Sequence, residues 1–127
     1  MTSEERKAWL RSLKVGDLVE SKWPDASAEQ ATVERVAEIT ETIIETAYRL
    51  NERAVNRYRR NTGRETGKFG RGELHPVTEA AMDKSDRLLL SQMVSDWNCR
   101  NKFSITTVRK LLSLLTEAER EAGKENQ

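Results

Sequence analysis

The sequence contains few of the side chains on which most catalytic and metal sites depend. Its 127 residues include one histidine, His75, and one cysteine, Cys99. A lone cysteine excludes an intramolecular disulfide and a zinc site built on thiolates. A general base needs a partner within hydrogen-bonding reach, and no residue spacing around His75 supplies one. We therefore expect a protein that is not an enzyme and that holds neither a cofactor nor a metal.

Long apolar runs are also missing. No run approaches the roughly 20 residues that a membrane-spanning helix needs, and the opening residues MTSEERKAW lack the apolar core of a signal peptide. We therefore expect no membrane partner and a cytoplasmic location. The hydrophobic content of 36% is enough for one modest core, and the charged content of 34% predicts a well-solvated surface.

The charged residues are segregated along the chain, although the net charge is only +1. Residues 15–48 carry eight acidic and two basic side chains, whereas residues 49–72 carry eight basic and two acidic ones. Four of the six glycines lie between residues 63 and 72. A basic, glycine-rich segment of this kind is typical of a surface that binds phosphates or an acidic protein. The alternative is that its arginines pair with acids on neighbouring strands.

Three segments have the apolar spacing or the capping residues of helices: residues 3–13, 79–97 and 106–121. Ser3 and Thr78 are the expected N-caps of the first two, because a side-chain oxygen at that position accepts a bond from a free backbone N–H. The second and third segments carry more apolar surface than two helices can bury between themselves. That surplus predicts either docking on the rest of the protein or a homodimer through the C-terminal helices.

The pair His75–Pro76 marks a boundary between two parts of the chain. We predict one domain over residues 1–73 and a helical extension over residues 74–127. The first domain ends in a hairpin formed by the basic, glycine-rich residues 55–72, which we call the basic hairpin.

The stretch from residue 27 to residue 60 fits two different structures. Its apolar residues fall at helical spacing, so it can form one long amphipathic helix. However, eight of the fourteen residues from Val33 to Thr46 are β-branched, and such residues lose rotamer freedom in a helix. The alternative is a pair of strands at about 30–38 and 41–48, followed by a strand over residues 54–60. Spacing and propensity alone do not decide between the two.

Three stretches, taken in order, resemble a group of small, largely uncharacterised phage-type proteins: WLRSLKVGDLV, ATVERVAEITETIIE and RYRRNTGRETG, followed by an apolar-striped helix and a final LLSLL helix. The resemblance implies an α+β fold with a short N-terminal helix, a small SH3-like β-barrel and a C-terminal two-helix extension, so it favours strands over the long helix. Between Thr46 and Tyr58 the chain is longer than the pattern and has no glycine, which leaves residues 47–54 open as turn or helix.

Small phage proteins of this size often act on host machinery, including as inhibitors of host defence. The resemblance therefore implies a non-enzymatic binding protein, located in the host cytoplasm if phage-encoded. We predict that it contacts nucleic acid or a host nucleoprotein through the basic hairpin. The alternative is an anti-defence inhibitor of the anti-CRISPR type, which binds a host defence protein and blocks its nucleic-acid function.

The candidate contacts all lie in the basic hairpin. Aromatic rings stack on bases, and cations reach phosphates. The candidates are Arg57, Tyr58, Arg59, Arg60, Arg64, Lys68, Phe69 and Arg71. Outside the hairpin, Trp23 lies next to Pro24 at a strand end and is the tryptophan that the pattern allows to be exposed. An exposed tryptophan is a frequent contact hot spot.

Overall fold

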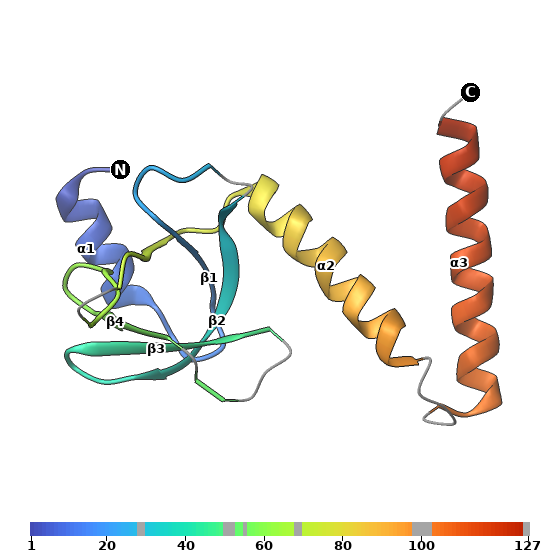
Figure 1. The fold of residues 1–127 in the computed structure, drawn as a ribbon, viewed down its shortest axis with the longest axis horizontal. Coiled ribbons are helices and arrows are strands. Elements are labelled where there is room, and N and C mark those ends of the chain that lie inside the picture. Colours follow the sequence, from blue (N-terminus) through green and yellow to red (C-terminus); the bar gives the residue numbers. More distant parts are fainter. Residues whose placement is uncertain (28–29, 50–52, 55, 68–69, 98–102, 126–127) are drawn as a thin grey trace. The chain divides into compact units, whose positions relative to one another are not determined.

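The computed structural model describes the chain except residues 28–29, 50–52, 55, 68–69, 98–102 and 126–127. Its elements are α1 (Ser3–Ser12), β1 (Leu18–Lys22), β2 (Thr32–Ile39), β3 (Ile43–Tyr48), β4 (Asn56–Arg59), β5 (Glu73–His75), α2 (Glu79–Trp97) and α3 (Ile105–Glu125) (Figure 1). The predicted α+β class is confirmed. The chain forms two compact units, Met1–Ser91 and Gln92–Gln127.

The five strands form one antiparallel sheet in the order β4–β3–β2–β1–β5, and this sheet curls into a half-barrel (Figure 1). A register shift between Val36 and Glu38 in β2 marks a bulge, which bends a strand and increases its twist. Two isolated bridges, Tyr58–Glu65 and Arg64–Glu73, link the outer strands β4 and β5 through residues 64–65. The strands predicted at 30–38 and 41–48 are confirmed, and the single long helix is wrong.

The sequence leaves residues 47–54 open as turn or helix, and the structure describes this segment only in part. Arg49, Arg53 and Ala54 are not helical, and residues 50–52 and 55 lie outside the described residues. The SH3-like identity of the barrel stays a prediction.

The hydrophobic core lies on the inner face of the curled sheet. Its buried members are Leu10, Leu13, Val19, Val36, Ile44, Tyr58 and Leu74. Each of the five strands supplies one of them, at a position whose side chain points inward, because successive side chains of a strand point to opposite faces. Burying a leucine or valine completely contributes about 1.5–3 kcal/mol. Leu10 and Leu13, at the end of α1 and just after it, therefore hold this helix on the sheet.

Thr2, and not the predicted Ser3, is the N-cap of α1. The Thr2 hydroxyl accepts a bond from the Glu5 N–H at 3.1 Å, and Glu5 Oε2 accepts one from the Thr2 N–H at 3.3 Å. This reciprocal pair is a capping box, which satisfies two backbone donors at once.

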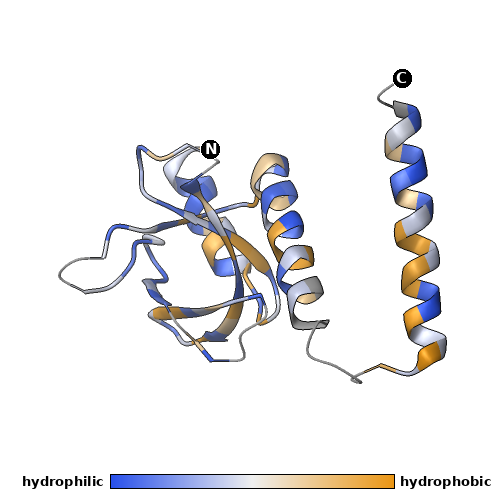
Figure 2. Cartoon of the chain, turned by 45° about the vertical axis from the view of Figure 1, so that its right-hand side comes forward, coloured by the Kyte–Doolittle hydropathy of each residue, from blue (hydrophilic) through white to orange (hydrophobic). Residues whose placement is uncertain are grey.

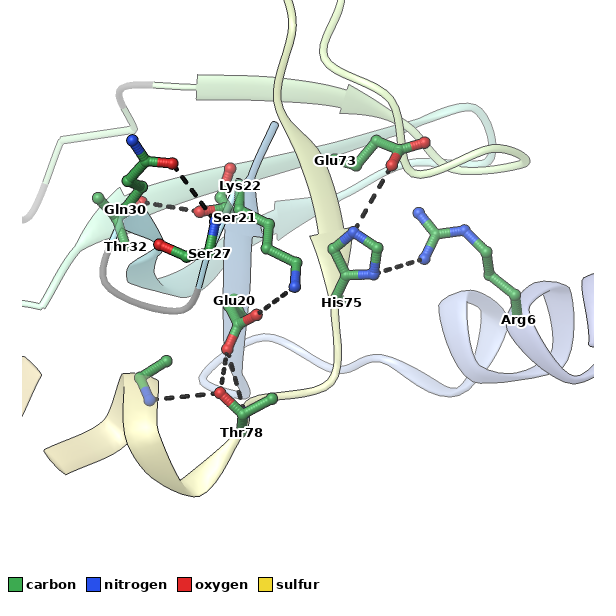
Figure 3. Close-up of polar contacts among 11 residues, drawn as sticks. Arg6, Glu20, Ser21, Lys22, Ser27, Gln30, Thr32, Glu73, His75 and Thr78 are labelled. Carbon is green, nitrogen blue, oxygen red and sulfur yellow. Dashed lines mark hydrogen bonds and ion pairs between the residues drawn. The ribbon is translucent and has the colours of Figure 1, made fainter. Parts of the chain in front are cut away.

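A buried carboxylate fixes the start of α2 on the outer face of the sheet. Glu20 of β1 is fully buried, and its Oε1 accepts bonds from the N–H of Thr78 at 3.1 Å and from its hydroxyl at 2.6 Å (Figure 3). The Thr78 hydroxyl accepts in turn from the Ala81 N–H at 3.3 Å, which confirms Thr78 as the cap of α2. Ala81 packs with Ala31 and Val33 in a second, smaller core.

These contacts place the boundary between the two units later than residue 73, where the sequence predicts it. Residues 73–75 belong to the sheet because they pair with β1, and the first turns of α2 are anchored to the same sheet. The boundary falls inside α2, after Ser91.

The second unit contains the end of α2 and all of α3. Apolar residues concentrate in the first half of α3 (Figure 2), where Ile105, Leu112 and Leu114 are exposed. The homodimer through the C-terminal helices stays a prediction. No helix in the described part of the chain is both long and apolar enough to span a membrane.

His75 lies between an arginine of α1 and an acid of its own strand (Figure 3). Arg6 Nη1 is 3.4 Å from His75 Nδ1, and Glu73 Oε2 is 3.6 Å from Nε2. A guanidinium only donates, so Nδ1 is the acceptor and the neutral ring carries its proton on Nε2. Burial, and then the charge of Arg6, lower the pKa of His75, whereas Glu73 opposes this effect.

The lowered pKa of His75 predicts a loss of stability in weak acid. Below the ordinary pKa of 6.5, the unfolded chain binds a proton more readily than the folded protein does, so the free energy of unfolding falls as the pH drops from about 7 to about 5.5. His75→Gln, which does not titrate, flattens this decline. Urea unfolding at a series of pH values measures it.

Glu73→Gln is the matched control for that experiment. It removes an acid that favours protonated His75, so the decline between about pH 7 and pH 5.5 becomes steeper. Equal slopes in the wild type and in His75→Gln contradict this account of His75.

Candidate functional site

The inner face of the sheet is apolar around Val36 and polar around Glu34, two residues earlier in β2. Glu34 is 1% exposed. Its Oε1 accepts bonds from the hydroxyls of Thr46 at 2.5 Å and Tyr58 at 3.1 Å and from the Asn56 amide at 3.0 Å. Its Oε2 accepts a bond from the Thr32 hydroxyl at 2.8 Å. The carboxyl group is therefore held by donors from β2, β3 and β4.

Tyr58 connects this network to the opposite side of the half-barrel. Its hydroxyl lies 2.7 Å from Ser21 Oγ of β1. Burial, and then the negative charge of Glu34, raise the pKa of Tyr58 well above its ordinary value. The hydroxyl therefore keeps its proton, donates to Glu34 and accepts from Ser21.

The same burial corrects the prediction that Tyr58 stacks on a base. The side chain is 1% exposed and packs in the core with Ile44 and Leu74, so its ring offers no face to a ligand. The alternation of β4 points Tyr58 inward because Ile44 of β3 is its cross-strand neighbour.

An inner hollow of about 300 Å³ opens onto this polar network. Its walls include Ser21, Trp23, Gln30, Glu34, Tyr58 and Gly72. A Cβ atom on Gly72 would lie 3.1 Å from Ser21 Oγ and 3.1 Å from Glu65 Oε2. Glycine at position 72 therefore lets the backbone pass close to the network.

An outer hollow of about 470 Å³ adjoins the inner one and shares Trp23, Ala26, Gln30 and Gly72 with it. Trp23, directly after β1, is 60% exposed, as the sequence allows. The Arg71 guanidinium carbon lies 5.7 Å from the centroid of the Trp23 ring, within the range of a cation–π contact. Arg64 also lines this hollow, and its Nε is 3.4 Å from Glu73 Oε1.

The other candidate arginines lie elsewhere. Arg57 and Arg59 are exposed on the outer face of β4, opposite to Tyr58. Arg57 Nε is 3.2 Å from Glu45 Oε1, on the facing position of β3. The alternative that the arginines pair with acids of neighbouring strands is thus confirmed for this pair.

Arg60 is directed toward the main chain. It donates to the carbonyl oxygens of Thr40 at 3.1 Å and Arg11 at 3.3 Å, so it joins the turn after β4 to α1 and to the β2–β3 turn. Lys68 and Phe69 lie outside the described residues, and their predicted contacts stay predictions.

The buried hydrogen-bond network around Glu34, which lines the inner hollow, was not predicted from the sequence. One signal for it exists, because Thr32, Glu34 and Val36 alternate along β2 and therefore share a face. An acid in register with core valines must be hydrogen-bonded, since a buried carboxylate without partners is strongly unfavourable.

The residues considered for catalysis do not form a site with this network. His75 contacts Arg6 and Glu73 on the outer face, and Cys99 lies outside the described residues. In the part of the chain that the structure describes, no group of three or more His, Cys, Asp or Glu side chains is placed to hold a metal ion.

Comparisons with known proteins place this chain in no group: no protein-family model, no curated protein and no solved structure matches it. The resemblance to phage-type proteins, and the anti-defence activity that it implies, stay predictions.

Removal of the Tyr58 hydroxyl tests the network. In Tyr58→Phe, Glu34 loses one donor and Ser21 loses its acceptor, and both are buried, so we expect a loss of about 1–3 kcal/mol in the free energy of unfolding. Urea unfolding measures it.

Tyr48→Phe is the matched control. Tyr48 is 48% exposed at the end of β3, so loss of its hydroxyl changes stability by less than about 0.5 kcal/mol. Equal losses in the two variants contradict a structural role for the buried network.

Proposed function

We propose that this protein binds single-stranded nucleic acid at the outer hollow, with Trp23 as a stacking platform and Arg64 and Arg71 as phosphate contacts. The observation that carries the proposal is the exposed Trp23 ring beside the Arg71 guanidinium at the rim of a hollow. Stacking of a base on an aromatic side chain contributes about 1–3 kcal/mol and tolerates any base.

The two arginines are suited to phosphates. The Arg64 side chain is 73% exposed, although the side chain of its partner Glu73 is only 17% exposed. A guanidinium has five N–H donors, so Arg64 can donate to a phosphate from the N–H groups that Glu73 does not use. The Arg71 guanidinium carbon lies 5.7 Å from the centroid of the Trp23 ring, and a guanidinium in a cation–π contact still has N–H groups that can donate to a phosphate.

A single strand fits this surface better than a duplex. Bases in a duplex are stacked on both faces, so one reaches a protein ring only after it leaves the stack, which costs a few kcal/mol. A base in a flexible single strand is already available to Trp23.

Fluorescence anisotropy with a labelled single-stranded DNA of mixed sequence tests the proposal between about 50 and 200 mM salt. Arg64→Gln and Arg71→Gln each reduce the slope of log affinity against log salt by about 0.7, because each removes one phosphate contact. Trp23→Ala lowers affinity about 5- to 150-fold through lost stacking, with little change in slope.

Arg57→Gln and Arg59→Gln are the matched controls, since they make the same charge change on the outer face of β4. We expect both to keep the wild-type affinity and slope. If these two variants lose affinity while Arg64→Gln and Arg71→Gln do not, the site is on the outer face of β4. If the wild type does not bind at low salt, the proposed function is wrong.

A further inference from the structure

We propose that the protein forms a homodimer in which α3 pairs antiparallel with α3 of a second copy. This contact does not depend on the proposed nucleic-acid function. It specifies the helix, the facing residues and the orientation of the homodimer that the sequence predicts.

The apolar face of α3 is left without cover. No described residue of the second unit is buried, although α3 is 21 residues long and apolar over its first half (Figure 2). Leu112 and Leu115 are 58% and 42% exposed. Most of the stability of a protein helix comes from packing of its amphipathic face. The described part of the chain does not supply that packing, so we infer that a second molecule does.

One line of positions on α3 has the spacing of a helix–helix contact. Its residues are separated alternately by three and four, as positions a and d of a coiled coil are. All of them are exposed. These six positions, which we call the α3 seam, are Ile105, Val108, Leu112, Leu115, Glu119 and Ala122.

The α3 seam fits a copy of itself that runs in the opposite direction. A two-fold axis between residues 113 and 114 places Leu112 opposite Leu115 of the second copy, and Ile105 opposite Ala122. In a two-fold symmetric contact, each such pair occurs twice. The seam is therefore self-complementary, and this favours a second copy of the chain over a different protein.

Glu119 decides between the two orientations. In a parallel pair, equivalent seam positions face each other, so Glu119 faces Glu119 of the second copy, and like charges across a contact oppose association. The same two-fold axis places Glu119 opposite Val108 of the second copy and next to its Arg109. Two ion pairs per dimer then replace one repulsion, so the charges favour the antiparallel orientation.

Sedimentation equilibrium of the full chain, up to about 100 μM, tests the dimer, since that concentration is about a hundred times the Kd of a micromolar complex. We expect the mass of a dimer at the upper end of the series. Leu112→Glu places a charge in the middle of the seam and weakens association about 30-fold or more. A wild type that stays monomeric throughout overturns the proposal.

Ser113→Glu is the matched control, because it introduces the same side chain one residue away and off the seam. We expect it to keep the wild-type association. Far-UV circular dichroism establishes that both variants keep their helices. If Leu112→Glu dimerises as well as Ser113→Glu does, the contact does not lie on the α3 seam and the proposal is wrong.

Reversal of the charges tests the orientation. Arg109→Glu and Glu119→Arg each place like charges side by side in the antiparallel dimer, so each weakens association about 2- to 30-fold. The double variant Arg109→Glu/Glu119→Arg restores the ion pairs with their signs exchanged and recovers the wild-type association. A dimer that the single changes do not weaken, or that the double variant does not recover, contradicts the antiparallel orientation. Trp23, Arg64 and Arg71 are unchanged in all these variants, so strand binding reports on the proposed function separately.

Discussion

The buried carboxyl group of Glu34 needs hydrogen-bond donors in place of water, and several strands of the first unit supply them. A carboxylate removed from water is tolerated only when hydrogen bonds replace its hydration, and the donors here come from β2, β3 and β4. Ser21 of β1 joins them through Tyr58. In the sheet order, β1 and β4 are separated by two strands, so these two hydroxyls meet across the interior only because the sheet curls. The curl and the network therefore depend on each other.

The interior of the first unit has an apolar part and a polar part. Around Val36 and Leu74 the inner face is apolar and closed by α1, and this part holds the fold together. Around Glu34 it is polar, and there the structure is hollow. The side chains that hold the Glu34 carboxylate are fixed in place, because they cannot rearrange without leaving a buried polar group unpaired.

Part of the fold could be predicted from the sequence, and little of the site. The β-branched residues between Val33 and Thr46 favour β2 and β3, but spacing and propensity left one long helix open, and only the resemblance to phage-type proteins favoured the strands. Thr78 predicts the start of α2 because its capping signal is local. Alternation places Tyr58 and Arg57 on opposite faces of β4 but does not say which face is inside, since both neighbours of Tyr58 are arginines. That answer comes from pairing with Ile44. Glu34 looks like one more acid in an acidic block, because its donors lie up to 24 residues away.

The described cations of the block between residues 49 and 72 do not form one positive surface. Arg57 pairs with Glu45, Arg60 bonds to carbonyl oxygens, and Arg49 Nη1 lies 2.6 Å from Asp86 Oδ1. Of the described cations in this block, only Arg64 and Arg71 line the outer hollow, where the acids Asp25 and Glu73 also lie. Two phosphate contacts on a single strand give a salt slope of about −1.4, whereas eight would give about −5.6. In the proposed binding mode, stacking on Trp23 therefore holds the strand more than phosphate contacts do, and salt shifts the affinity far less than the basic sequence suggests.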